Sequence, residues 1–374
     1  MIETRRGLLT GLSAAVLCGC SEPTQSRDAV VGTAPTAAPG PASPLPLDAP
    51  PLRSCAPFAV GTCVSTGVFS DPPLQALILK HFSQVTPEWE MKMERILSRT
   101  GALDFSAPDR IADFCRQNRL GLHATTLVWY DQQPDYFLAM GDDRARFEAF
   151  YRRYIATVVD RYKGVARGWD VLNEAVAENG NGYRGGIWER TLGPDYARIA
   201  FQAAHEADPK AVLFLNDYNL ATMPTKLDAF QRLLEGLLQA GAPVGGIGLQ
   251  SHLPIDIEKG AYGRAMAALA RFGLPIHVSE LTVSMRLAGG ANGLGDSYLQ
   301  TQARVMQEVA EAFLALPPKQ RYAFTVWGVR DRDSFLRRGA NAGDGADRPL
   351  LFDDEGRPKP CLFALEKVFA EAKT

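Results

Sequence analysis

Two glutamates close hydrophobic segments of this chain in corresponding places. Glu174 ends the run Gly168-Trp-Asp-Val-Leu-Asn-Glu174, and Glu280 ends the run Pro275-Ile-His-Val-Ser-Glu280. A carboxylate at the end of an apolar strand should be partly buried at the rim of the sheet. One such glutamate could serve only in an ion pair, but two in matching positions favour a shared chemical role. A pair of carboxyl groups flanking one bond is what the hydrolysis of a glycosidic bond requires.

Further polar and aromatic residues follow the ends of the predicted strands. They are Thr86-Pro-Glu88, Trp129, Asn173, Asn216-Asp-Tyr-Asn219, Gln250-Ser-His252 and Trp327. Aromatic rings stack on the apolar face of a sugar, while amides and carboxylates bind its hydroxyl groups. The residues at these strand ends are therefore typical of a carbohydrate site.

Short β-rich segments alternate with longer amphipathic ones and would position these residues. The sequence predicts strands over 58–65, 84–88, 122–129, 166–174, 211–219, 245–253, 275–281 and 322–329. It predicts helices over 72–82, 108–118, 144–162, 194–207, 224–240, 258–272, 297–316 and 361–372. Strict alternation of eight strands and eight helices predicts an α/β fold, a single (β/α)8 TIM barrel with its chemistry at the carboxyl ends of the strands. A doubly wound open sheet is the alternative, but no G-x-G-x-x-G follows the first strand.

Several motifs, in order along the chain, resemble glycoside hydrolase family 10, the β-1,4-xylanases. They are Thr86-Pro-Glu-Trp-Glu-Met-Lys92, Leu127-Val-Trp129, Trp169-Asp-Val-Leu-Asn-Glu-Ala175, Asn216-Asp-Tyr-Asn219, Gly246-Ile-Gly-Leu-Gln-Ser-His-Leu253, Ser279-Glu-Leu281 and Thr325-Val-Trp-Gly-Val329. The resemblance covers the chain from about Phe58 to Ala372. It implies retaining hydrolysis of internal bonds in xylan by an endo-1,4-β-xylanase.

The same resemblance assigns roles to individual residues. Glu174 would be the acid/base and Glu280 the nucleophile. Asn173 would hold the 2-hydroxyl of the sugar at the cleavage point, and His252 would hydrogen-bond the nucleophile. The remaining expected substrate-binding residues are Gln250, Trp327, Trp129, Glu88 and Lys92.

The chain departs from the family pattern mainly on the glycone side of the expected site. Trp89 stands where the family usually has Asn, Thr125 where it has His, and Phe335 where it has Trp. Likewise, Tyr130 stands where the family has His, Tyr136 where it has Trp, and Thr282 where it has Asp. The contacts that define ordinary xylan binding are therefore partly rebuilt, so another β-linked glycan or short xylo-oligosaccharides remain alternative substrates.

The first 52 residues predict export rather than a folded domain. Arg5 and Arg6 precede an apolar run, as in a twin-arginine signal peptide over 1–20. Leu17-Cys-Gly-Cys20 resembles a lipobox, which would place a lipid anchor on Cys20 of a periplasmic or cell-surface protein; a plain cleaved signal is the alternative. Residues 21–52 are rich in Pro and Ala and predict an extended tether, so the catalytic domain should span 53–374.

Composition and cysteine usage exclude other classes of protein. The 40 basic and 42 acidic residues give a net charge of −2, which argues against nucleic-acid binding. Histidine and cysteine spacings match no common metal motif, so we expect neither metal nor cofactor, and we expect a monomer. Cys55 and Cys63 could form a disulfide or remain free, whereas Cys115 and Cys361 should be buried thiols. A non-catalytic glycan-binding barrel is a further alternative, against which stands the presence of Glu174, Glu280, Asn173 and His252 together.

Overall fold

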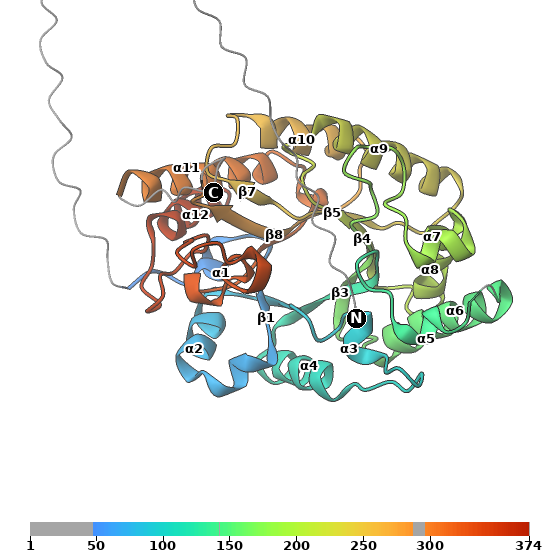
Figure 1. The fold of residues 1–374 in the computed structure, drawn as a ribbon. Helices are drawn as coiled ribbons and strands as arrows, with labels where there is room; N and C mark the ends of the chain where they lie inside the picture. Colours follow the sequence, from blue (N-terminus) through green and yellow to red (C-terminus); the bar gives the residue numbers. More distant parts are fainter. Residues whose placement is uncertain (1–47, 142, 287–295, 374) are drawn as a thin grey trace, which may run out of the picture. The chain divides into compact units, whose positions relative to one another are not determined.

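The computed structural model describes residues 48–141, 143–286 and 296–373 of the 374-residue chain. Within them, eight parallel strands close into a barrel (Figure 1). These strands are β1 (Ala59–Val64), β2 (Gln84–Pro87), β3 (Gly121–Trp129), β4 (Ala166–Asn173), β5 (Val212–Asp217), β6 (Gly246–Leu249), β8 (Ile276–Ser284) and β9 (Arg321–Val326). β9 pairs with β1, and β6 pairs with β8, which completes the ring. The predicted (β/α)8 barrel is confirmed.

Helices surround the barrel and follow the strands in sequence (Figure 1). The long ones are α2 (Pro72–His81), α4 (Ser106–Asn118), α6 (Arg144–Arg161), α8 (Asp195–Ala207), α9 (Pro224–Gln239), α10 (Ala261–Ala270), α11 (Asp296–Leu314) and α12 (Pro360–Glu371). Short helical turns are α1 (Leu52–Cys55), α3 (Met93–Ile96), α5 (Asp135–Leu138), α7 (Ile187–Leu192), η1 (Thr66–Ser70), η2 (Pro318–Gln320), η3 (Asp331–Asp333), η4 (Phe335–Arg337) and η5 (Gly339–Asn341). Local chemistry sets the helix starts: α2 begins at Pro72, and the Asp71 carboxylate accepts a hydrogen bond from the Leu74 amide at 2.9 Å.

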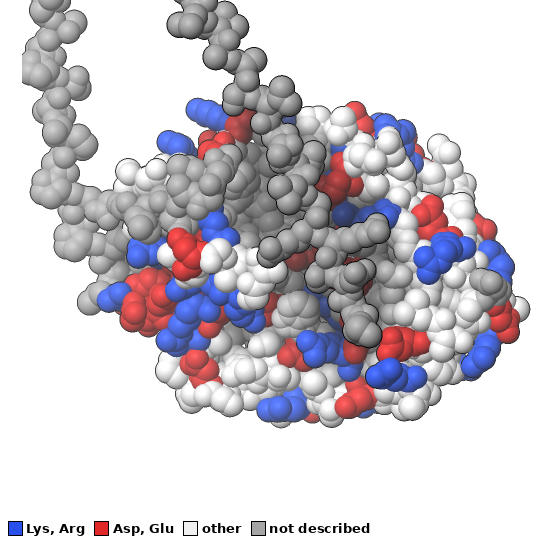
Figure 2. Space-filling model, in the orientation of Figure 1, with Lys and Arg blue, Asp and Glu red and all other residues white. Residues whose placement is uncertain are grey.

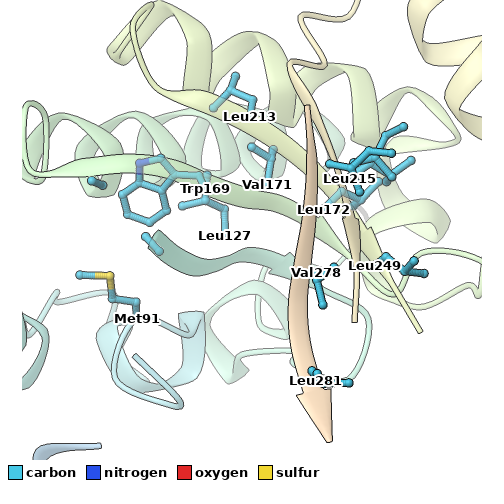
Figure 3. Close-up of a cluster of buried hydrophobic side chains, with 14 of the residues drawn as sticks. Met91, Leu127, Trp169, Val171, Leu172, Leu213, Leu215, Leu249, Val278 and Leu281 are labelled. Carbon is cyan, nitrogen blue, oxygen red and sulfur yellow. The ribbon is translucent and has the colours of Figure 1, made fainter. Parts of the chain in front are cut away.

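The strands are buried on both faces, which explains their continuous apolar runs. Between barrel and helices, Trp169, Leu213 and Val278 belong to one hydrophobic cluster (Figure 3). A second, polar layer forms where the His123 Nε2 atom lies 3.0 Å from the Asp170 carboxylate and the His277 ring packs against the His123 ring. Both faces of the sheet are thus filled, and the strand ends are fixed relative to one another.

The segment predicted as one strand over 245–253 is divided in the structure. β6 ends at Leu249, and a short strand β7 (His252–Pro254) pairs instead with the carboxyl half of β8. Ser251 between them has a φ of 65°, a left-handed conformation that no strand continues through. The break turns His252 toward β8, where it lies opposite Thr282 in the register.

Other expectations from the sequence have mixed outcomes. Cys55 and Cys63 are free thiols, so the possible disulfide is not formed, and Cys115 and Cys361 are buried as predicted. The signal peptide, the lipobox at Cys20 and most of the predicted tether lie outside the described residues. Ala49 and Leu52 are already buried in the core. The domain boundaries and the monomeric state stay predictions.

Two structural findings concern membrane-spanning helices and metal-binding groups. Across the described parts of the chain, no helix is long and apolar enough to cross a membrane. In the same residues, no group of three or more His, Cys, Asp or Glu side chains is arranged to hold a metal ion.

Candidate active site

The two rim glutamates come from β4 and β8. Glu174 directly follows β4, whereas Glu280 lies within β8, which continues to Ser284 beyond the strand end predicted at 281. Trp129 Nε1 donates to Glu174 Oε2 at 2.8 Å, and the amides of Gln250 and Asn173 donate to Glu174 Oε1 at 3.1 and 3.3 Å. The second glutamate, Glu280, is only 7% exposed. Each carboxylate is thus held by side chains from neighbouring strands.

Asn216, at the end of β5, connects the two carboxylates. Its Nδ2 atom donates to Glu280 Oε1 at 2.9 Å and to Asn173 Oδ1 at 2.8 Å, while its Oδ1 accepts from the Ser279 hydroxyl at 2.8 Å. Gln250 completes the link, because it donates both to Asn173 and to Glu174. Asn216 itself is fully buried. Three amide side chains therefore join the glutamates into one hydrogen-bonded unit: Asn216, Asn173 and Gln250.

A glycine on the next strand makes room for Asn216. A Cβ atom on Gly248 of β6 would lie 2.1 Å from Asn216 Oδ1, well inside any allowed contact. Without a side chain at this position, the Asn216 amide can lie flat against β6 and reach Glu280. Gly248 therefore contributes to the site because it has no side chain to displace Asn216.

His252 contacts the other oxygen of Glu280. Its Nε2 atom lies 3.3 Å from Glu280 Oε2, and its Nδ1 atom lies 3.0 Å from the Thr282 hydroxyl. The hydroxyl can donate to Nδ1, which in the neutral ring directs the Nε2 proton at Glu280. Phe335 packs edge-on against the same imidazole at 5.0 Å between ring centres. The contact between His252 and Glu280 expected from the sequence is present.

Burial sets the protonation preference of Glu174. Burial raises the pKa of its carboxyl, and the charges of Glu280 and Asp217 raise it further, while hydrogen bonds from Trp129 and Gln250 act in the opposite direction. The net direction is upward, so the proton is held more tightly than on a free glutamate. A carboxyl group with a raised pKa is suited to donate a proton near neutral pH.

The backbone at Glu174 is itself unusual. Its φ is 54°, in the left-handed region that side chains other than glycine seldom adopt. Its amide donates to Asn216 O at 2.8 Å, and its carbonyl accepts from Arg184 Nε at 3.0 Å. Such a conformation persists where surrounding contacts over-determine it, and it re-aims the side chain away from the strand direction.

A cationic and aromatic group lies beside the carboxylates, at the ends of β2 and β3. The Lys92 ammonium lies 4.2 Å from the ring centre of Trp89 and 4.5 Å from that of Trp129. Burial lowers the pKa of Lys92, against the attraction of Glu280, Glu174 and Glu88. Burial also raises the pKa of Glu88, although Arg338 and Lys92 oppose that shift.

A family comparison accounts for this arrangement. The sequence model described as Glycosyl hydrolase family 10 matches residues 53–368. The chain belongs to glycosyl hydrolase family 10. It is 33% identical over 326 residues to the endo-1,4-beta-xylanase A of Caldicellulosiruptor sp. (strain Rt8B.4), which covers 82% of this chain and 46% of that protein.

Two further relatives cover more of their own length. The endo-1,4-beta-xylanase B of Thermotoga neapolitana is 32% identical over 293 residues, covering 78% of this chain and 82% of that protein. A solved structure of a thermostable mutant of a xylanase from Cellvibrio japonicus matches with a TM-score of 0.79 at 30% identity, covering 86% of this chain and 99% of the other. The chain thus spans under half of the first relative but nearly all of the last.

The residues predicted from the sequence gather at one rim of this family 10 barrel. Glu88 and Lys92 follow β2, Trp129 ends β3, and Asn173 and Glu174 end β4, while Gln250, His252, Glu280 and Trp327 come from β6 to β9. The Trp327 amide donates to Leu281 O at 2.9 Å, directly beyond Glu280. Thr125 is buried in β3, and Trp89 is 36% exposed.

Three residues of the site were not singled out from the sequence of this family 10 chain. Asn216 stood within a quoted motif at a strand end, which was the available signal. Arg184 and Arg338 lie in irregular segments, where neither periodicity nor strand position distinguishes them from surface arginines. Arg184 donates to Glu178 Oε1 at 2.8 Å and to the Tyr218 hydroxyl at 3.0 Å. Arg338 donates to Glu88 Oε1 at 2.6 Å.

Proposed function

We propose that this chain is an endo-β-1,4-xylanase, which cleaves internal bonds of xylan with retention of configuration at the anomeric carbon. The observation that carries the proposal is the hydrogen-bonded unit that joins Glu174 and Glu280 through Asn216, Asn173 and Gln250. The family, and relatives named as endo-1,4-beta-xylanases, support xylan as the substrate.

In the first step, Glu280 acts as the nucleophile. Its carboxylate attacks the anomeric carbon and forms an ester with the sugar, while Glu174 gives its proton to the departing glycosidic oxygen. The raised pKa of Glu174 keeps that proton in place until the bond breaks. Asn216 and His252 hydrogen-bond the two oxygens of Glu280, and so direct the carboxylate.

In the second step, Glu174 acts as a base. Its carboxylate takes a proton from water, and the water oxygen attacks the anomeric carbon and releases Glu280. Formation of the ester removes the negative charge on Glu280, which is one cause of the raised pKa of Glu174. The pKa of Glu174 therefore falls between the two steps, as the change from acid to base requires.

The remaining predicted residues would bind the sugars. We assign the 2-hydroxyl at the cleavage point to Asn173, which Asn216 and Gln250 both hold through its Oδ1 atom. Trp129 and Trp327 would line the same subsite, and Glu88 and Lys92 would bind the next sugar. Hydrogen bonds to the 2-hydroxyl strengthen as positive charge develops in the transition state.

A substrate panel tests this function. Purified protein is assayed on xylan, mannan, β-glucan and xylo-oligosaccharides, beside Glu280→Ala, Glu174→Ala and the exposed control Glu258→Ala. We expect turnover of xylan, its loss in Glu280→Ala, and wild-type rates in the control. Glu174→Ala should keep activity on aryl glycosides whose leaving groups need no proton. Turnover of mannan or glucan in preference to xylan would refute the proposed substrate, and activity in Glu280→Ala would refute the mechanism.

We also propose export and a lipid anchor on Cys20, as finer features of the same protein. The support is the order Arg5-Arg6, apolar run, Leu17-Cys-Gly-Cys20 in the sequence. One acyl chain binds membranes only marginally, so stable anchoring requires several chains on the cysteine. Detergent partitioning and mass spectrometry of the mature N-terminus should show bound lipid that Cys20→Ser abolishes. An unmodified N-terminus would refute the anchor.

A further inference from the structure

Arg338 lies on the segment that also carries Phe335 and is fixed by three contacts. Its Nη2 atom donates to Glu88 Oε1 at 2.6 Å and to Asp333 O at 3.0 Å, and its Nε atom donates to Ser334 O at 3.4 Å. The other terminal nitrogen, Nη1, makes no hydrogen bond to any residue that the structure describes. The guanidinium is therefore held in place with donors still available.

The two members of the Arg338–Glu88 pair differ in exposure. The Glu88 side chain is 7% exposed, whereas that of Arg338 is 46% exposed. The pair thus buries its negative member and presents its positive member to solvent. A ligand that approaches this side of the site meets a guanidinium before it meets the carboxylate.

A cavity of about 260 Å³ adjoins the pair, and Arg332 and Arg338 are its most exposed charged side chains, while Asp71, Asp333 and Glu88 also line it and are less exposed. Arg330 lines the cavity but is buried, and it is already paired with Asp71 at 2.7 Å and Asp333 at 2.8 Å. Arg332 is half exposed, and its one ion pair among the described residues is long, at 3.8 Å to Asp71. Figure 2 shows Lys and Arg side chains, with Asp and Glu side chains beside them, where Figure 1 draws the orange-red segment.

Glu88, which is expected to bind a sugar, also lines this cavity. The buried thiol of Cys63, which also lines the cavity, is within electrostatic reach of Glu88, Glu280, Arg338 and Lys92. At about 260 Å³ the cavity is slightly smaller than the ~300–1,000 Å³ of sites for drug-sized ligands. Its size suits a single branch of a glycan rather than another length of chain.

We propose that this cavity receives an acidic branch of the substrate, and that Arg338 binds the carboxylate of a uronic acid attached to the xylan backbone. The inference rests on the proposed function and names its substrate class more closely. Neutral xylose offers only hydroxyl groups, for which an exposed guanidinium has no particular preference. Arginine presents parallel N–H donors that match the two oxygens of a carboxylate, so the branch is recognised by charge and by shape.

Two oligosaccharides that differ only in the branch test the proposal. One is an unbranched xylo-oligosaccharide, and the other carries a single glucuronic acid near its non-reducing end. We compare kcat/KM for both in the wild type, Arg338→Ala, Arg338→Lys and the control Arg271→Ala, an arginine of similar exposure paired with Glu235 between helices. Binding of both compounds is also measured by calorimetry in Glu280→Ala, with and without Arg338→Ala.

We expect the ratio of acidic to neutral kcat/KM to fall about ten-fold or more in Arg338→Ala, because a hydrogen bond to a charged group is lost. Arg338→Lys should recover part of the ratio, since the charge remains but the paired donors do not. The control should leave the ratio unchanged. Added salt should lower the ratio in the wild type, because the exposed Arg338 charge is screened.

The outcomes separate the two proposals. An unchanged ratio in Arg338→Ala, with both compounds hydrolysed, would show that the Arg338–Glu88 pair only stabilises the fold of this segment, and would overturn this inference. Failure of the wild type to hydrolyse either compound would overturn the proposed function instead. Calorimetry decides the branch contact independently of turnover: equal affinities for both compounds in Glu280→Ala would also overturn the inference.

Discussion

Replacing Asn216 by aspartate should disable the nucleophile while hardly changing the shape of the site. Asn216 Nδ2 lies 2.9 Å from Glu280 Oε1 and 2.8 Å from Asn173 Oδ1, and the side chain is fully buried. In Asn216→Asp an oxygen takes the place of that nitrogen, so two carboxylates would meet at the same distance. At an effective dielectric constant of about 20, two unit charges 2.9 Å apart repel by about 6 kcal/mol.

That repulsion is too large for both groups to stay ionised. One proton would be shared between Asp at 216 and Glu280, as in other carboxylate pairs, and the nucleophile would lose most of its charge. Asn216→Ala removes the hydrogen bonds to Glu280, Asn173 and Ser279 without adding a charge. For the lost contact with Glu280, a loss of roughly 10- to 150-fold in kcat/KM is expected. We expect Asn216→Asp to lose more than Asn216→Ala does.

The assay is kcat/KM on an aryl β-xylobioside, whose leaving group needs no proton from Glu174. This constant covers the steps up to and including the attack by Glu280, and so excludes the later hydrolysis of the ester. Circular dichroism and thermal unfolding establish that each variant is folded. Asn219→Asp in the same loop is the matched control and should stay within a factor of about two of the wild type, since among the described residues its side chain hydrogen-bonds Thr222 and neither glutamate. If Asn216→Asp were as active as Asn216→Ala, the contact with Glu280 would not control the nucleophile.

Three further predictions follow from other contacts. Trp129→Phe removes a donor that stabilises ionised Glu174, so the pKa of Glu174 should rise and the alkaline limb of the kcat–pH profile should move to higher pH; a limb that moves downward contradicts this. Lys226→Met leaves Asp217, its fully buried partner at 2.9 Å, without this ion pair. Urea unfolding should then show a free energy of unfolding lower by about 3–5 kcal/mol, which the double variant with Asp217→Asn partly restores. Equal stabilities of the single and double variants would refute the pairing argument. The triple variant Trp89→Asn, Thr125→His and Phe335→Trp restores the usual family residues. It should raise kcat/KM on unbranched xylo-oligosaccharides by roughly five- to hundred-fold, and no change would mean that the three side chains serve only in packing.

The sequence was most informative where burial and strand geometry act together. Runs such as Val212-Leu-Phe-Leu215 predict strands buried on both faces, and polar residues directly after them must share one rim, which is where Glu174 and Glu280 lie. These relations depend on residue type and spacing alone. The fold could therefore be predicted, and so could the position of Glu174 and Glu280 at one rim of the barrel.

Features that depend on backbone conformation or on distant loops could not be predicted in the same way. Ser251 adopts a left-handed conformation without being glycine, so nothing in its type indicates that β6 ends before His252. The Arg338–Glu88 pair joins residues 250 positions apart, and such a contact exists only once the barrel has closed. The free state of Cys55 and Cys63 likewise follows from three-dimensional placement rather than from their spacing.

The stereochemistry of the first product tests the central claim most directly. Hydrolysis of a β-linked xylo-oligosaccharide is followed by proton NMR during the first minutes, before the released hemiacetal equilibrates. A nucleophilic Glu280 and an acid/base Glu174 predict that the β-anomer forms first, with the two carboxyl groups ~5–5.5 Å apart in the working enzyme. Initial formation of the α-anomer would contradict the account, because a single displacement by water would then replace the ester on Glu280.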